Sequence, residues 1–286
     1  MTSPPARPSR VTRAPADDRG APDAQARVER AWRPRLLTEP SDAAFRDAYD
    51  ALHAAMRNRS ERARLYETTL TRLDRAFLAR LPAAARVLDI GAGNGRFARA
   101  AAARRVVALE ISGQAIAVMR AAPSACGPPA IVQASGLRLP FGAESFDVVV
   151  SQDLIEHLHP DQLQPHLSEV HRVLMPAGRY LLHTPSGLQA STSFGLHLRE
   201  YRLRDLRRAA QACGFRPRWI VMNLSRLGWT GTAPDRLWPL VEAWETLWGA
   251  LGRHGLRRLG GRAYAAAVPD GDLELIKLGR GCESSI

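Results

Sequence analysis

A glycine-rich stretch at residues 91–95 is the first place in this 286-residue chain where the backbone could bind a ligand directly. Gly91, Gly93 and Gly95 alternate after the apolar run Val87-Leu88-Asp89-Ile90, and a helical pattern follows. Glycine allows a sharp turn and lets a ligand lie against bare peptide groups. Because the next residue is arginine, the loop departs from the GxGxxG of dinucleotide-binding proteins, and it lacks the Gly-Lys-Ser/Thr of a P-loop. Asp89 is placed to accept hydrogen bonds from backbone amides or from an ammonium ligand.

A second carboxylate, Glu110, ends the next apolar run, Val106–Leu109. An acidic residue about 20 positions after such a loop commonly accepts hydrogen bonds from ribose hydroxyls. The alternative is a solvated acid at the end of a strand.

Three of the eight histidines are candidate general bases, because histidine titrates near neutral pH. His157 follows the run Phe146–Ser151, and its alternative is a structural or cofactor-side role. His183 ends another strand pattern, where it could equally be a core histidine. His197 begins the cluster His197-Leu198-Arg199-Glu200-Tyr201, which could instead be a helix N-terminal network. The three cysteines have no metal-ligand spacing, so no metal site is expected and a reducing, cytoplasmic location is favoured.

The elements that must position these residues alternate along the chain. Short apolar runs predict strands, and amphipathic stretches between them predict helices. Strands joined by crossover helices require a mostly parallel sheet with helices on both faces. The predicted strands lie at 86–90, 106–109, 130–133, 146–151, 180–183, 219–222 and 273–278, and the helices at 97–103, 113–120, 162–174 and 202–213.

The predicted organisation has five parts. Residues 1–35 hold six prolines and few large apolar side chains, which predicts a disordered tail. Residues 36–82 show helical spacing and predict N-terminal helices that lie over the core. The core spans 83–223, a helical insertion spans 224–271, and 272–286 supply the last core strand and a tail.

The insertion holds four of the six tryptophans and an apolar helical stripe from Leu237 to Leu251. Three interpretations stay open. It could be a lid over an apolar acceptor, a peripheral membrane or lipid contact assisted by nearby arginines, or a helix packed on the core or on a second subunit.

Composition excludes several classes of protein. Hydrophobic residues make up 45% of the chain, enough for a real core, and no apolar run is long enough to span a membrane. The N-terminus shows no secretory signal. The net charge is +12, but all basic residues except Lys277 are arginines, which suggests a GC-rich genome. Since the basic residues form no tight run, a nucleic-acid partner is disfavoured.

Six ordered motifs between Arg86 and Phe215 resemble those of class I S-adenosylmethionine-dependent methyltransferases, in particular the small-molecule branch. They are VLDIGAGNG, ALEIS, LPF, FDVVVSQDLIEHL, EVHRVLMPAGRYLLHTP and a closing CGF. The resemblance implies a Rossmann-like, seven-stranded, mostly parallel sheet, with Lys277 in the last, antiparallel strand. It also implies S-adenosylmethionine as the cofactor.

The resemblance further implies roles for individual residues. The cofactor would be bound by Asp89 and the three glycines under its methionine and ribose, by Glu110 on the ribose hydroxyls, by Ser135 and Leu137 at the adenine, and by Ser151 and Gln152 at the methionine end. Ser135 departs from the aspartate that is common in the family, so adenine recognition is in question.

The predicted function is methyl transfer by in-line displacement to a small or medium organic acceptor, with O-methylation favoured. One alternative is a catalytically silent methyltransferase-like scaffold or regulatory protein. The other is a NAD-dependent oxidoreductase, which the arginine after Gly95 disfavours. Methylation of nucleic-acid bases is disfavoured because no Asn-Pro-Pro-aromatic sequence follows residue 150. The acceptor and the oligomeric state stay open.

Overall fold

The structure is a computed structural model that describes residues 21–56, 70–102, 104–122, 129–186, 196–221, 231–232, 235–253 and 273–278. Among these residues, no helix is long and apolar enough to cross a membrane.

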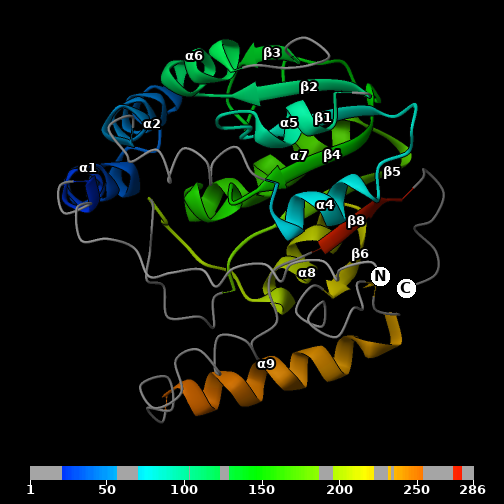
Figure 1. The fold of residues 1–286 in the computed structure, drawn as a ribbon. Coiled ribbons are helices and arrows are strands. Elements are labelled where there is room, and N and C mark those ends of the chain that lie inside the picture. The colour runs from blue at the N-terminus through cyan, green and yellow to red at the C-terminus, as the bar shows by residue number, and fades with distance from the viewer. Residues whose placement is uncertain are drawn as a thin grey trace, which may run out of the picture.

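A single eight-stranded sheet in the order β3-β2-β1-β4-β5-β8-β6-β7 forms the centre of the molecule (Figure 1). β1, β2, β3, β4 and β5 pair in parallel, and β8 is antiparallel to both β5 and β6. The predicted seven strands are present, and the two-residue β7 extends the edge. The strands are β1 (Arg86–Ile90), β2 (Arg105–Glu110), β3 (Ala130–Gln133), β4 (Phe146–Gln152), β5 (Leu174–His183), β6 (Phe215–Val221), β7 (Gly231–Thr232) and β8 (Leu273–Lys277).

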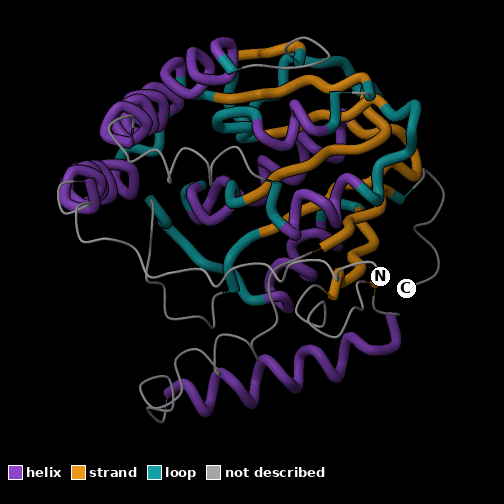
Figure 2. The backbone as a smooth tube through the Cα atoms, viewed as in Figure 1, coloured by secondary structure: helices purple, strands orange, loops and turns teal. Residues whose placement is uncertain are grey.

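Helices cover both faces of the sheet, as predicted (Figure 2). Successive strand residues point to opposite faces, so Val87 packs against one helical layer and Leu88 against the other. The first layer contains α4 (Arg72–Leu78), α5 (Arg96–Ala100) and α6 (Gly113–Ala121), and the second contains α7 (Leu163–Val173), α8 (Leu203–Ala212) and α9 (Trp238–Arg253).

The prediction of a disordered tail over residues 1–35 is wrong for residues 21–35, which belong to helix α1 (Ala21–Thr38). Its few apolar residues recur at helical spacing: Val28, Trp32 and the fully buried Leu36 pack against α2 (Asp42–Met56). Pro22 falls in the first turn, where no amide donor is required, whereas Pro34 lies inside the helix and removes one of its backbone hydrogen bonds. Residues 1–20 lie outside the described part of the chain.

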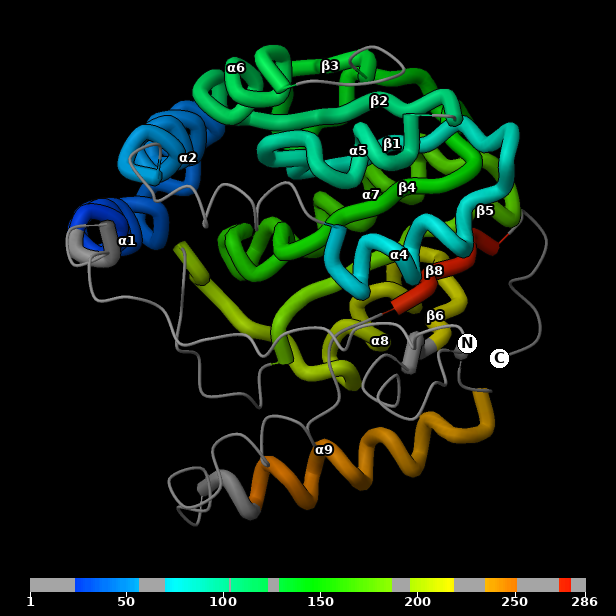
Figure 3. The backbone as a smooth tube through the Cα atoms, viewed as in Figure 1, coloured from blue at the N-terminus to red at the C-terminus, as the bar shows by residue number. Residues whose placement is uncertain are grey.

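Helices α1 and α2 form an outer layer beside α6 (Figure 3). Asp50 anchors α2, since its Oδ1 accepts hydrogen bonds from Ser112 Oγ at 2.7 Å and from the Gln114 amide at 3.1 Å. The other helix of the predicted N-terminal region is α4, which packs against one face of the sheet. Residues 57–69, between α2 and α4, lie outside the described part of the chain.

Within the predicted insertion, α9 packs on the core through one face. Trp238 and Val241 are buried, and Glu245 Oε1 and Oε2 accept hydrogen bonds from the Leu203 and Arg204 amides at the start of α8, at 2.7 and 3.1 Å. The opposite face exposes Leu240, Trp244 and Leu247, which are 65%, 49% and 57% exposed. This supports the core-packed interpretation for the inner face. A partner for the outer face, membrane or subunit, stays a prediction.

Candidate functional site

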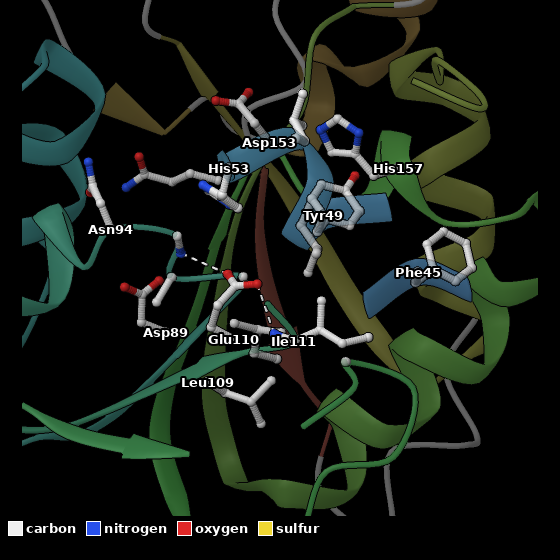
Figure 4. Close-up of a pocket in the computed structure, with 18 of the residues that line it drawn as sticks. Phe45, Tyr49, His53, Asp89, Asn94, Leu109, Glu110, Ile111, Asp153 and His157 are labelled. Carbon is white, nitrogen blue, oxygen red and sulfur yellow. Dashed lines mark hydrogen bonds between the residues drawn. The ribbon is translucent and has the colours of Figure 1, made fainter. Parts of the chain in front are cut away.

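A pocket of about 720 Å³ opens where the strand order reverses, at the carboxyl ends of β1, β2 and β4. Parallel α/β sheets bind ligands at this switch point, because the helices that follow neighbouring strands cross to opposite faces there. Figure 4 shows Asp89 and Glu110 on the sheet side and Phe45, Tyr49 and His53 of α2 on the other.

The glycine loop turns sharply over the end of β1. The Gly91 and Ala92 amides both donate to Leu109 O, at 2.8 and 3.1 Å, so the loop is fastened to β2. Gly93 has φ +54°, and a Cβ on it would meet no atom within 4 Å, which leaves open space in the pocket wall for a ligand.

Gly95 has a packing role and does not line the pocket. Its φ is +76°, and a Cβ on it would lie 2.5 Å from Met119 Cγ. The structure therefore divides the three predicted cofactor glycines: Gly91 and Gly93 line the pocket, whereas Gly95 allows α5 to begin close to α6.

Glu110 ties the loop to the second strand through three backbone amides. Its Oε2 accepts from the Gly93 amide at 2.8 Å, and its Oε1 accepts from the Ile111 and Ser112 amides at 2.8 and 2.9 Å (Figure 4). These bonds hold the carboxylate at the pocket wall, where it can accept further hydrogen bonds from two adjacent hydroxyls.

Several buried polar atoms of the pocket have no hydrogen-bond partner among the described residues, and two of them lie at the ends of β1 and β4. These two are Asp89 Oδ2 and Gln152 Nε2, an acceptor and a donor. Buried polar groups are normally paired, so this couple fits a ligand that carries an ammonium and a carboxylate. The methionine end of S-adenosylmethionine has both, and the residues present therefore fit this cofactor.

Burial, together with the nearby charges of Asp74 and Glu110, raises the pKa of Asp89 to about 7. A bound ammonium group would oppose these effects and favour the ionised carboxylate.

Ser135 and Leu137 both line the pocket, and the Leu137 amide donates to Ser135 Oγ at 3.2 Å. Ser151 does not line it. Its hydroxyl lies 2.6 Å from Tyr180 Oη, which in turn lies 2.9 Å from His166 Nε2. The expectation that Ser151 meets the cofactor is therefore not supported by its position: its side chain points into the core.

The outer wall of the pocket comes from helix α2, and sequence reasoning missed it. Its apolar spacing predicted a helix over the core, and that same stripe faces the ligand space. The lining residues of α2 are Phe45, Tyr49, Leu52, His53 and Met56, and Gln25 of α1 also contributes. Asn94, Arg96, Ile111 and Asp153 are further lining residues that the motifs did not single out.

The three candidate histidines surround the end of β4. His157 lines the pocket, with its ring 5.7 Å from Tyr49 and 4.8 Å from His197 in edge-to-face contacts. His197 lies behind His157 and outside the lining. His183 Nε2 lies 3.3 Å from Asp153 Oδ1, and this carboxylate faces the pocket with 58% of its side chain exposed.

Asp153 also has a left-handed backbone, with φ +52°. Such strain in a non-glycine residue is common at functional sites. The partial desolvation of Asp153 is outweighed by its hydrogen bond with His183 and by the charge of that histidine, which together lower the pKa of Asp153. Burial, helped by the charge on Asp153, raises the pKa of Glu156 to about 7.

Comparison with known proteins agrees with this geometry. Residues 88–182 match a family model described as "Methyltransferase domain". A "Probable S-adenosylmethionine-dependent methyltransferase" of Mycolicibacterium smegmatis is 36% identical over 126 residues, which are 43% of this chain and 47% of that protein. An uncharacterized methyltransferase of Mycobacterium marinum is 38% identical over 98 residues, 34% of this chain and 37% of that protein.

The chain thus spans less than half the length of these two curated relatives. Among solved structures, it is similar to a chain from the complex of the Haloferax volcanii Trm112 methyltransferase activator with a methyltransferase. The TM-score is 0.53 at 20% identity, over 80% of this chain and 96% of that one, which establishes the shared fold.

The fold and the pocket define a class I methyltransferase architecture. Together with the family match over residues 88–182, they show that this chain contains a methyltransferase domain with the class I fold.

Proposed function

We propose that the chain binds S-adenosylmethionine in the switch-point pocket and transfers its methyl group to a hydroxyl of a small or medium organic acceptor. One combination of groups in the pocket carries this proposal. Glu110 is held at the wall by three backbone amides, and Asp89 Oδ2 and Gln152 Nε2 are buried there without hydrogen-bond partners among the described residues. When bound, the cofactor supplies a methyl group on a positively charged sulfur.

The aromatic and apolar wall of α2 supports an organic acceptor with an apolar body. Phe45, Tyr49 and Leu52 face the pocket opposite the glycine loop. The volume of about 720 Å³ lies within the range of roughly 300–1,000 Å³ of small-molecule sites. Orientation of two reactants in such a space can supply as much as about 7–11 kcal/mol of the acceleration.

The Asp153–His183 pair is the proton acceptor that this geometry favours. Asp153 faces the pocket and His183 lies directly behind it at 3.3 Å. An acceptor hydroxyl must lose its proton as the new bond forms, and a positioned base contributes roughly 10²–10⁴-fold. In this proposal Asp153 accepts the proton. Of the three histidines considered from the sequence, His183 is the one that contributes, by its contact with Asp153.

Titration calorimetry with S-adenosylmethionine, S-adenosylhomocysteine and NAD tests the cofactor assignment. We expect saturable binding of the first two and none of NAD. Binding of NAD alone would favour the oxidoreductase alternative, and binding of none would favour a silent scaffold.

The Asp153→Asn variant tests the proton acceptor once an acceptor is found. Asparagine tolerates the left-handed backbone, so S-adenosylhomocysteine should bind as in the unchanged protein while turnover falls by roughly 10²–10⁴-fold. Full turnover in this variant would exclude Asp153.

A further inference from the structure

Three potential metal ligands converge beside the pocket. One donor atom from each of Glu156, His157 and His197 lies within 4.8 Å of the others. Glu156 and His157 belong to the 3₁₀ turn η1 (Ile155–His157), which begins three residues after β4 ends. His197 lies 40 residues after His157 in the chain.

The buried atoms of this cluster are incompletely paired. Glu156 is fully buried; its Oε2 accepts from Thr184 Oγ1 at 2.9 Å, but Oε1 has no hydrogen-bond partner among the described residues. His157 Nδ1 also lacks one. A carboxylate oxygen and an imidazole nitrogen are both lone-pair donors, and a buried carboxylate is costly unless a cation or donor compensates it.

The backbone holds His197 in place against the turn. The Leu198 and Arg199 amides donate to Glu156 O at 2.8 and 3.1 Å. His197 Nδ1 lies 3.4 Å from Glu200 Oε1. A metal-bound histidine usually has a carboxylate or carbonyl on its other ring nitrogen, which fixes the tautomer and orients the ring. Glu200 occupies that place if Nε2 binds the ion.

We propose that Glu156, His157 and His197 bind a divalent transition-metal ion of the Zn²⁺ type. Two histidines and one carboxylate are a common donor set for such ions, and three protein ligands leave a coordination position for an oxygen from outside. Metal–ligand bonds of about 2.0–2.2 Å require the donor atoms to approach one another by roughly 1 Å. The sequence predicted no metal site because the cysteines lack metal-ligand spacing. The donor set proposed here contains no cysteine, and it forms only when folding brings the distant His197 next to Glu156 and His157.

The site borders the pocket through His157, which lines it. A metal there would lie next to the space assigned to the acceptor. This consequence rests on the proposed function, but the binding of the ion does not.

Cobalt(II) titration of the untagged, chelator-treated chain tests the proposal. Visible absorption follows the cobalt, and calorimetry with Zn²⁺ gives the affinity. We expect saturable 1:1 binding. Changes in outer partners of metal ligands cost about 10–100-fold, so Glu200→Gln should weaken binding by roughly tenfold, and His157→Ala or His197→Ala by at least about 100-fold.

His159→Ala is the matched control, because His159 lies two residues beyond His157 and contacts Asp161 instead of this cluster. It should bind cobalt as the unchanged chain does. Circular dichroism verifies the fold of each variant, and S-adenosylhomocysteine binding is a second check for the variants of His197, Glu200 and His159. His197→Gln is measured beside His197→Ala because glutamine is closer to histidine in volume. Two results would overturn the metal site: no saturable binding to the unchanged chain, or binding to the His197→Ala and His197→Gln variants as tight as to the unchanged chain. Retained S-adenosylhomocysteine binding would then leave the cofactor proposal intact.

Discussion

At the scale of single residues, Glu110 unites the two halves of the candidate cofactor site. Its carboxylate joins the glycine loop to the end of β2 through the Gly93, Ile111 and Ser112 amides. The same side chain therefore shapes the loop and is the acceptor that we propose for the ribose hydroxyls. One substitution should affect both properties.

Glu110→Ala should weaken S-adenosylmethionine binding by roughly 100-fold, because charge-assisted hydrogen bonds contribute about 1.5–3 kcal/mol each. Titration calorimetry measures the affinity. Glu39→Ala removes an exposed carboxylate of the same charge and serves as the control. If the affinity of Glu110→Ala equalled that of the control, the ribose assignment would be wrong.

Asp89 should make cofactor binding depend on pH. Its pKa of about 7 means that the carboxyl is protonated at lower pH, and only the ionised form pairs with an ammonium group. Affinity for S-adenosylhomocysteine should therefore fall as pH decreases from 7.5 to 5.5, approaching about tenfold per pH unit below pH 6. This range lies below the usual pKa of an α-amino group, about 7.7–8.0.

Asp89→Asn is the control for this dependence. It should bind more weakly at pH 7.5 and show little change across the range, since it has no ionisable group. The same slope in Asp89→Asn as in the unchanged chain would assign the titration to another group.

At the scale of elements, helix α8 depends on α9 for its start. Its N-cap residue, Arg202, makes no side-chain capping bond, and the first amides are satisfied by Glu245 from α9. The carboxylate also carries the negative charge that favours a helix N-terminus. Helix α9 of the predicted insertion is thus attached to the methyltransferase core through Glu245. This contact does not depend on a partner for the exposed outer face of α9.

Glu245→Ala should lower the free energy of unfolding by about 1–2 kcal/mol, the usual cost of a lost cap. Urea denaturation measures it. Glu242→Ala is the matched control on the same helix: Glu242 pairs with Arg207 at 2.8 Å but is partly exposed, so we expect a loss under about 1 kcal/mol. Equal losses would show that Glu245 does not cap α8.

At the scale of the whole molecule, helices α1 and α2 complete the pocket that the sheet begins. They pack through a cluster that includes Leu36, Phe45 and Leu198, and the last of these follows His197. The N-terminal layer therefore supports the pocket wall and the segment that carries a proposed metal ligand. Removal of residues 1–35 should destabilise the protein, contrary to what a disordered tail would predict.

Leu36→Ala should reduce the free energy of unfolding by about 2–5 kcal/mol, because Leu36 is fully buried. Leu240→Ala, on the exposed face of α9, should change it by less than about 0.5 kcal/mol. Both are measured by urea denaturation, with S-adenosylhomocysteine binding as a second readout. If Leu36→Ala left the free energy of unfolding unchanged, α1 would not pack as described.

The sequence by itself determined the order of strands and helices, the glycine loop and the place of Glu110. These features depend on neighbours in the chain: the boundaries of β3 agree with the prediction because an apolar run needs no distant contact to be recognised. Helix α1 was not predicted from the sequence, because Val28, Trp32 and Leu36 form an apolar cluster only when α2 packs against them.

Only the tertiary structure decided which side chains meet. Ser151 and Gln152 are adjacent in β4, yet one points into the core and the other lines the pocket, since alternate strand residues face opposite ways. Asp153 meets His183 across 30 positions, and Glu156 meets His197 across 41. No local pattern records such contacts, because the packing of the whole chain brings these residues together.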